Sequence, residues 1–210
     1  MSGPRIPMPV IGIVGGIGAG KSEVGRILQR LGCVVSDSDV GARAALEEDE
    51  VRRTLIGWWG PGVYDAAGRA DRAAIGRIVF ADASQRTRLE GVIHPRLKVG
   101  REAMKAAAEA GGARAFIIDA PLLFEAGLEA ECDAVIFVDS PAEQRLARVG
   151  ATRGWDEAEW RRRESAQLTL EEKRRRSGYA VANSTDRTDL ERQVRTVLEA
   201  IIDRRSQDSN

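Results

Sequence analysis

An eight-residue segment, GGIGAGKS, constrains the fold of this 210-residue chain more than any other feature. It runs from Gly15 to Ser22 and follows an apolar stretch, Val10 to Val14, that is typical of a short buried strand. Glycine lets the backbone turn tightly and brings its N–H groups close to phosphate oxygens. The match to the pattern G-x-x-x-x-G-K-[ST] therefore predicts a phosphate-binding loop between a strand and a helix.

Each part of this loop has an expected role. Its main-chain N–H groups would bind the phosphates of a nucleotide, helped by the positive end of the dipole of the following helix. Lys21 would reach the β- and γ-phosphates, and the hydroxyl of Ser22 would contact a Mg²⁺ ion. The alternative is a glycine-rich turn beside a solvent-exposed lysine, and the motif alone does not say which nucleotide binds. The expected nucleotide-binding residues are Gly16, Gly18, Ala19, Gly20, Lys21, Ser22 and Glu23.

Strand-like and helix-like segments alternate along the chain. Apolar runs of strand length occur at 33–35, 115–119 and 134–139. Residues 40–110 are mostly helical in pattern, apart from a Gly-rich turn region at 60–68. Strands that are apolar on both sides favour a parallel sheet covered by helices on both faces. The sequence therefore predicts an α/β fold in which ligands bind at the carboxyl ends of the strands.

The charge of the chain is balanced, with 32 basic and 32 acidic side chains. Such a chain has no overall field that would attract nucleic acid or a membrane surface, so we expect neither as a partner. No apolar run approaches the length of a membrane span, and the segment MSGPRIPMPV at the start lacks the apolar stretch of a signal peptide. The two cysteines, Cys33 and Cys132, are expected to be buried, reduced thiols of a cytoplasmic protein.

Acidic residues follow three of the predicted strands. Asp37 and Asp39, in the segment SDSD, would lie beside the glycine loop in a parallel sheet. If the extended backbone continues through this segment, both side chains project to one side, where one could accept a proton from an alcohol and the other could orient Mg²⁺. The alternative is a solvated turn, because Asp and Ser are common turn residues. Of the two later acids, we prefer Asp119 to Asp139 as the carboxylate that orients Mg²⁺.

Basic residues are concentrated between residues 145 and 176. Acidic residues interleave with them, so most are expected on solvated helix surfaces. Arg148 and Arg153 flank VGAT, a weak helical segment that would suit a hinge. An arginine that closes over the γ-phosphate would stabilise its charge, and we predict a catalytic role for at least one of this pair. His94, the single histidine, precedes a proline, which is more typical of a structural position or a helix cap.

Several segments together resemble the dephospho-coenzyme A kinase family. They occur in the family's order from about residue 10 to residue 184 and are IGIVGGIGAGKS, VVSDSDVGAR, IHPRL, DAPLLFEAGL and RVGATRG, followed by Gln167, Lys173 and Asn183-Ser184. Each segment after the first is weakly specific alone, whereas the combination is strongly specific. The resemblance implies transfer of the γ-phosphate of ATP to the ribose 3′-hydroxyl of dephospho-CoA, the last step of coenzyme A biosynthesis.

The resemblance also implies site residues. It assigns Asp39 to the acceptor hydroxyl, with Asp37 in support. It also implies that Arg148 and Arg153 correspond to the arginines of the family's lid, the segment that closes over the substrates. The residues expected to bind the acceptor are Asp37, Asp39, Arg43, His94, Pro121 and Leu122. The expected catalytic residues are Asp39, Lys21, Arg148 and Arg153. The expected Mg²⁺ ligands are Ser22 and Asp119.

Two segments depart from the family pattern. Glu23 stands where the family usually has Thr, and we expect its side chain to face away from the phosphates or toward a basic residue on the adenine side. An acid in the first turn of a helix also suits the helix dipole. The segment SGYAVANST, where a final edge strand is expected, is less acidic and less Ile-rich than in the family.

The expected architecture is a P-loop NTPase three-layer sandwich with a parallel sheet, a helical acceptor-binding insertion and a lid, within a single kinase domain over 1–210. ATP and Mg²⁺ are the expected cofactors, and the resemblance implies dephospho-CoA as the second substrate. The sequence does not indicate an oligomeric state.

The alternatives are a kinase for a nucleoside or shikimate-like acceptor, and a P-loop regulatory or nucleic-acid-binding ATPase. The expected parts are a core at about 8–40, 113–145 and 178–205, an insertion at about 41–112 and a lid at about 146–177.

Overall fold

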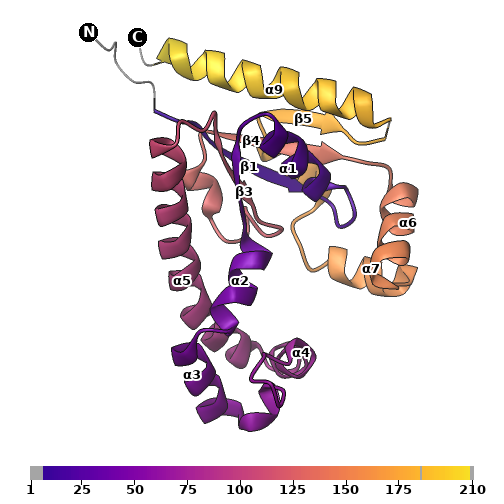
Figure 1. Ribbon diagram of the computed structural model, residues 1–210. Coiled ribbons are helices and arrows are strands. Elements are labelled where there is room, and N and C mark those ends of the chain that lie inside the picture. Colours follow the sequence, from indigo (N-terminus) through magenta and orange to yellow (C-terminus); the bar gives the residue numbers. More distant parts are fainter. Residues whose placement is uncertain (1–6, 185, 209–210) are drawn as a thin grey trace. The chain divides into compact units, whose positions relative to one another are not determined.

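The computed structural model describes residues 7–184 and 186–208. The chain divides into two compact units, which can be followed by colour in Figure 1. The first unit comprises Met1–Ser36 and Lys105–Asn210 and contains the sheet and the glycine loop. The second unit, Asp37–Met104, is mainly helical. Each unit has its own apolar core.

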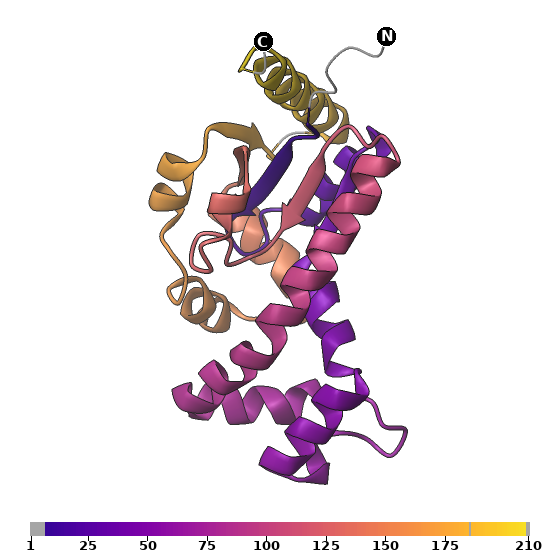
Figure 2. The same ribbon diagram turned by 90° about the vertical axis from the view of Figure 1, so that its left-hand side faces the viewer.

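A five-stranded sheet forms the centre of the first unit. Its strands are β1 (Val10–Gly15), β2 (Val34–Asp37), β3 (Phe116–Asp119), β4 (Ala134–Asp139) and β5 (Tyr179–Ala182). They lie in the order β2-β3-β1-β4-β5, with β1 parallel to β3 and β4, and β4 parallel to β5. Figure 2 shows β1 (indigo) alongside β3 (pink). The expected parallel sheet and its final edge strand are confirmed.

Helices cover both faces of this sheet. On one face, α1 (Lys21–Arg30) and α9 (Arg187–Asp208) pack against the strands, with Val24 and Leu28 fully buried. On the other face, the core includes the C-terminal end of α5 (Ala83–Ala110) and the segments that follow β3. Along β3, Phe116 and Ile118 point into the second core and Ile117 points into the first, as the alternation of side chains in a strand requires. The three-layer α/β sandwich is confirmed.

Three short helices connect β4 to β5: α6 (Ala142–Arg153), α7 (Glu157–Glu164) and α8 (Leu170–Arg176). α6 continues without interruption through VGAT, so the hinge expected there is not formed. A single glycine inside a helix is tolerated at a modest energetic cost, and Gly150 occupies such a position. The helix ends instead at Gly154, whose φ of 67° is the left-handed conformation common at helix C-termini.

The second unit contains helices that pack around a core of their own. Its elements are α2 (Ser38–Leu46), α3 (Asp49–Trp59), the 3₁₀ turn η1 (Pro61–Val63), α4 (Arg72–Ala81) and the N-terminal part of α5. Val51 and Leu55 are fully buried, and the hydroxyl of Tyr64 donates to the carbonyl of Leu46 at 2.7 Å. Apolar packing therefore holds these helices together, and the buried hydroxyl of Tyr64 has a hydrogen-bond partner.

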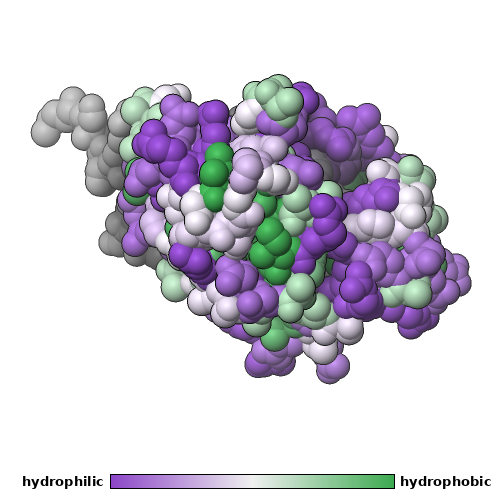
Figure 3. Space-filling view, turned by 90° about the horizontal axis from the view of Figure 1, so that it is seen from below, coloured by the Kyte–Doolittle hydropathy of each residue, from purple (hydrophilic) through white to green (hydrophobic). Residues whose placement is uncertain are grey.

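Figure 3 shows one face of the protein, on which hydrophobic residues (green) lie among pale and hydrophilic (purple) ones. Among the residues that the structure describes, the exposed large apolar side chains are Val40, Phe80, Val99, Met104 and Leu122. Exposed apolar residues at this level are ordinary for a protein surface. Within residues 7–184 and 186–208, no helix has both the length and the apolar character needed to cross a membrane.

Candidate active site

The glycine loop lies between β1 and α1, as the sequence predicts. Gly18 and Gly20 have φ angles of 82° and 92°, a left-handed conformation that favours glycine. Neighbouring atoms also exclude larger side chains. A Cβ on Gly20 would lie 2.0 Å from Nδ2 of Asn183, and one on Gly18 would lie 2.5 Å from the carbonyl oxygen of Arg145. Both glycines are therefore required by the shape of the loop and by what packs behind it.

The carbonyl oxygens of residues 15–19 each accept a hydrogen bond from a side chain. The donors are Lys21 to Gly15 (3.2 Å) and Gly16 (3.1 Å), Trp160 to Ile17 (3.3 Å), Arg148 to Gly18 (3.2 Å) and Ala19 (3.3 Å), and Asn183 to Ala19 (2.7 Å). These donors come from α1, α6, α7 and the segment after β5. A loop whose carbonyls are held by such donors can present its N–H groups to an anion.

A buried ion pair lies against the same loop. Arg145 of α6, with a side chain that is 5% exposed, pairs with Glu164 of α7, and its guanidinium lies 4.9 Å from the ring centre of Trp160. Nε of Arg145 also donates to the carbonyl of Ser140 at 3.2 Å, and Oε1 of Glu164 accepts from the N–H of Ile17 at 3.3 Å. The sequence analysis missed Glu164 because acids are frequent in this segment and no spacing distinguishes it from the exposed ones.

The two predicted catalytic arginines lie in different environments. Arg148 binds the outer side of the glycine loop and also donates to Oγ of Ser140 and to the carbonyl of Asn183, each at 2.9 Å. Arg153, at the end of α6, is exposed, and its guanidinium lies 4.9 Å from the ring centre of Trp155. The structure therefore brings Arg148 to the loop as a donor to its carbonyls, whereas Arg153 stacks on an aromatic ring.

Asp37 is the last residue of β2 and the N-cap of α2. Its Oδ1 accepts from the N–H groups of Asp39 at 2.8 Å and Val40 at 3.0 Å. The extended backbone expected through SDSD is therefore not formed, because the helix begins at Ser38 and this cap satisfies its first N–H groups. Asp39 is exposed in the first turn of α2, and its carbonyl accepts from Nε of Arg43 at 2.9 Å.

His94 lies in the middle of α5, one residue before Pro95, and is exposed. It is thus neither buried nor at a helix end, in contrast to the structural roles that its sequence context favours. Two further residues predicted to bind the acceptor lie in the first unit, after β3. Pro121 is half-buried there, and Leu122 is 46% exposed.

A polar cluster around one buried lysine ties the segment after β3 to α8. Nζ of Lys173, a residue that is 1% exposed, donates to Oε1 of Gln167 at 2.8 Å and lies 3.4 Å from both Oε1 of Glu125 and the carbonyl oxygen of Pro121. Oε1 of Glu125 in turn accepts from the N–H of Leu168 at 2.9 Å. Three of these side chains belong to the sequence motifs but had no predicted chemistry. The structure shows that they hold two segments together.

Of the two residues predicted to bind Mg²⁺, Asp119 ends β3, and Ser22 lies in the helix that follows the neighbouring strand, β1. Ser22 is exposed in the first turn of α1, and Asp119 is a buried residue that pairs in register with Ile13. No group of three or more His, Cys, Asp or Glu within 7–184 and 186–208 could hold a metal ion. One hydroxyl and one carboxylate nevertheless fit Mg²⁺, which takes its remaining ligands from substrate phosphates and water. The rival Asp139 pairs with Arg174 at 2.7 Å.

Glu23 lies in the first turn of α1, directly after the loop. Its carboxylate pairs with Arg26 of the same helix and, at 3.3 Å, with Arg187 at the start of α9. Both partners lie outside the glycine loop. The negative charge of Glu23 is therefore compensated by arginines, in addition to its favourable interaction with the N-terminal end of the helix dipole.

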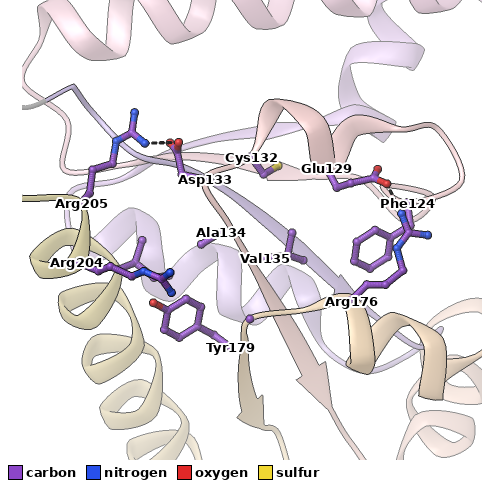
Figure 4. A pocket seen from close by; sticks show the side chains of 12 residues that line it. Phe124, Glu129, Cys132, Asp133, Ala134, Val135, Arg176, Tyr179, Arg204 and Arg205 are labelled. Carbon is purple, nitrogen blue, oxygen red and sulfur yellow. Dashed lines mark hydrogen bonds and ion pairs between the residues drawn. The ribbon is translucent and has the colours of Figure 1, made fainter. Parts of the chain in front are cut away.

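A cavity of about 500 Å³ lies at the other end of the strands, away from the glycine loop. It is lined by residues at the starts of β4 and β5 and by residues of α9, which Figure 4 shows as sticks. Two of its arginines are ion-paired, Arg176 with Glu129 and Arg205 with Asp133. None of the predicted site residues lines this cavity, so it is separate from the candidate active site.

A parallel sheet of this kind, with a glycine loop after its central strand, is typical of P-loop nucleotide-binding proteins, a class that includes small kinases. The comparisons with known proteins make this class more specific. The family model for dephospho-CoA kinase matches residues 9–189, and the chain belongs to this family. The chain is therefore a kinase, and the alternative of a P-loop regulatory ATPase is set aside.

Relatives and solved structures agree with this assignment. A dephospho-CoA kinase of Deinococcus radiodurans is 43% identical over 188 residues, which cover 90% of each chain. A protein of Thermus thermophilus with a crystal structure is 36% identical, with a TM-score of 0.79 over 93% of this chain and 98% of that one. A dephospho-CoA kinase of Campylobacter jejuni is 22% identical and shares the fold, with a TM-score of 0.69 over 92% of this chain and 97% of that one.

Proposed function

We propose that this protein transfers the γ-phosphate of ATP to the 3′-hydroxyl of the ribose of dephospho-CoA. The family match over residues 9–189 carries the proposal. In the reaction, the hydroxyl oxygen forms a bond to the γ-phosphorus while the bond from that phosphorus to the oxygen bridging the β-phosphate breaks. ADP leaves with the electron pair of the broken bond, and a base accepts the hydroxyl proton. The products are ADP and coenzyme A.

The glycine loop would bind the donor. Its N–H groups and the N-terminus of α1 would contact the phosphates, and Lys21, which now bonds to two loop carbonyls, would turn toward the β- and γ-phosphates. The transition state of phosphoryl transfer is loose, so the protein contributes mainly positioning and charge stabilisation. This matches a site made of backbone N–H groups and cations.

Asp39 would serve the acceptor. The carboxylate of Asp37 is committed to capping α2, whereas Asp39 is exposed one residue into that helix. We assign Asp39 to the acceptor hydroxyl, where it would orient the ribose and accept the proton. Arg43, His94, Pro121 and Leu122 complete the proposed acceptor-binding set.

The two arginines would act in different ways. Arg148 is engaged by loop carbonyls and would act on the phosphates through the shape of the loop. Arg153 is exposed, and the contact described above joins it to the ring of Trp155 and not to the loop carbonyls. We therefore assign charge stabilisation at the γ-phosphate to Arg153. We also propose that Ser22 and Asp119 hold Mg²⁺, which would neutralise charge on the β- and γ-phosphates.

The remaining proposals concern the setting of the protein. Neither Cys33, which is buried, nor Cys132, which is half-buried, forms a disulfide. Reduced thiols fit a reducing compartment, and we propose a cytoplasmic location. The balanced charge of the chain supports a protein that acts on small molecules and not on nucleic acid.

A panel of acceptors tests the proposed function. The protein is incubated with ATP, Mg²⁺ and either dephospho-CoA, adenosine or shikimate, and ADP formation is followed. We expect ADP to form with dephospho-CoA, and we expect Lys21→Ala to lower the rate by at least about 100-fold because a cation is lost at the transferred phosphate. If ADP forms with adenosine or shikimate but not with dephospho-CoA, the alternative of another small-molecule kinase is favoured.

A further inference from the structure

Both main-chain polar groups of one residue of the glycine loop, Ile17, are bonded to side chains of α7. Oε1 of Glu164 accepts from the N–H of Ile17, and Nε1 of Trp160 donates to its carbonyl, each at 3.3 Å. The two α7 residues are four positions apart, so they lie on the same face of the helix. The face of α7 that meets the loop is thus matched to the N–H and the carbonyl of one residue, Ile17.

Arg145 makes this arrangement possible. A carboxylate beside a phosphate-binding loop would repel a triphosphate, but Glu164 is paired with the buried guanidinium of Arg145. Nη1 of Arg145 also lies 3.5 Å from the carbonyl oxygen of Ile17. A Cβ on Gly16 would lie only 2.4 Å from the same Nη1, which shows how closely the guanidinium packs on the loop. The pair is therefore part of the loop's support.

We propose that Arg145, Trp160 and Glu164 are positioning residues for ATP, and that ATP binding is coupled to the docking of α7 on the glycine loop. The inference rests on the proposed function only in taking this loop as the ATP site. An undocked α7 leaves the N–H of Ile17 without Glu164 and its carbonyl without Trp160, and the loop is then less ordered for phosphate. Because coupling between two equilibria is reciprocal, bound ATP must in turn stabilise the docked α7.

The first test measures nucleotide affinity. The double variant Trp160→Phe, Glu164→Gln removes the indole donor and the negative charge, while it keeps an aromatic ring at 160 and nearly the same side-chain size at 164. We expect it to raise the Kd of a non-hydrolysable ATP analogue about tenfold, the effect of losing one or two partly buried hydrogen bonds. In turnover, KM for ATP should rise in the same way with kcat changed less, because the lost interaction stabilises bound ATP and the transition state alike.

A matched control lies on the same helix. Glu157 pairs with Arg161 on the exposed side of α7, with side chains that are 55% and 71% exposed. Glu157→Gln removes one carboxylate of α7 as Glu164→Gln does, but it touches no loop atom in the contacts described. We expect its Kd for the analogue to equal that of the unaltered protein. An equal loss of affinity in both variants would mean that α7 acts only through its general stability, and it would overturn the proposal.

The second test uses the unaltered protein. We expect the analogue to slow amide hydrogen exchange in α7, and we expect this protection to be lost in the double variant. Exchange in α7 that is the same with and without bound analogue would overturn the coupling, even if the double variant does not fold. If the protein binds the analogue with these changes but does not phosphorylate dephospho-CoA, only the proposed function fails. If it binds no analogue, both fail.

Discussion

At the scale of single residues, side chains of the same type have different roles here. Asp37 and Asp39 are two positions apart and chemically identical, yet one caps a helix and the other is exposed. Arg148 and Arg153 likewise differ, since one donates to loop carbonyls and the other stacks on a ring. The residue type and spacing predict that such groups are present, whereas only the local backbone decides which of them is available for chemistry.

Asp39→Asn tests the proposed base. The amide cannot accept the hydroxyl proton as a carboxylate does, so we expect kcat to fall by about 10²- to 10⁴-fold. KM for ATP should change little, because Asp39 is assigned to the acceptor. Steady-state kinetics with each substrate varied in turn would measure both. Asp71→Asn, which keeps an N-cap side chain at α4, is the control and should retain full activity. A loss of ATP binding in Asp39→Asn would contradict the assignment.

Cys33 should be unreactive in the folded protein. Burial raises the pKa of its thiol from 9.0 to about 11, and the nearby charge of Arg114 offsets only part of this effect. The thiolate is the nucleophile, so iodoacetamide at about pH 8 should modify Cys132 before Cys33, as peptide mass spectrometry would show. Because the folded-state pKa is raised, the neutral thiol contributes stability below pH 9 that is lost as the pH rises toward 11. Faster modification of Cys33 would contradict this.

At the scale of elements, the glycine loop could be predicted because its requirements are local. The tight turn, the left-handed glycines and the following helix all lie within one short segment. The donors behind the loop could not be predicted in the same way, because Trp160 and Asn183 are brought to it only by the fold. Asn183 belongs to a sequence motif without an assigned role, and Trp160 belongs to none of the motifs. Its indole N–H proves to be a polar group with a specific partner.

Gly20→Ala tests the shape of the loop. The new methyl would meet Nδ2 of Asn183, and the left-handed φ would be strained, so we expect the loop to distort. The expected result is loss of nucleotide binding, measured by calorimetry, together with a destabilisation of about 1–2 kcal/mol. Gly57→Ala is the control. Gly57 is exposed inside α3 with open space around it, so this change should stabilise the protein by about 0.5–1 kcal/mol. Normal nucleotide affinity of Gly20→Ala would contradict this account.

Lys173→Met tests the contact between α8 and the segment after β3. Removing the buried ammonium leaves Glu125 and Gln167 without their shared donor. Because the side chain of Glu125 is 23% exposed and can still be hydrated, we expect a cost of about 1–3 kcal/mol. The melting temperature should fall accordingly. Adding Glu125→Gln removes the unpaired charge, so the double variant should be less destabilised than the sum of the single variants. Strictly additive losses would show that the two side chains are not coupled.

At the scale of the whole molecule, the chain forms two units without a linker between them. One boundary falls at the end of β2 and the other inside the continuous helix α5. No run of Gly, Pro or Ser marks either place, which explains why turn signals in the sequence do not locate these boundaries. The predicted insertion at 41–112 and lid at 146–177 remain proposals about domain organisation.

The fold class was predictable as a whole because the apolar strands, the glycine loop and the alternation with helices all indicate the same architecture. The sheet order confirms it. The assignment of Asp39, Arg153 and the Mg²⁺ ligands is less determined by the sequence. These roles depend on substrates that approach from outside the chain, and on distances that spacing along a sequence does not define.

The most direct test of the central claim is to locate the transferred phosphate. Dephospho-CoA, ATP and Mg²⁺ are incubated with the protein, and the product is analysed by fragmentation mass spectrometry and phosphorus NMR. We predict a single product that carries one added phosphate on the ribose 3′-oxygen and that is identical to coenzyme A. Unchanged dephospho-CoA in the presence of bound ATP, or a phosphate at any other oxygen, would contradict the account.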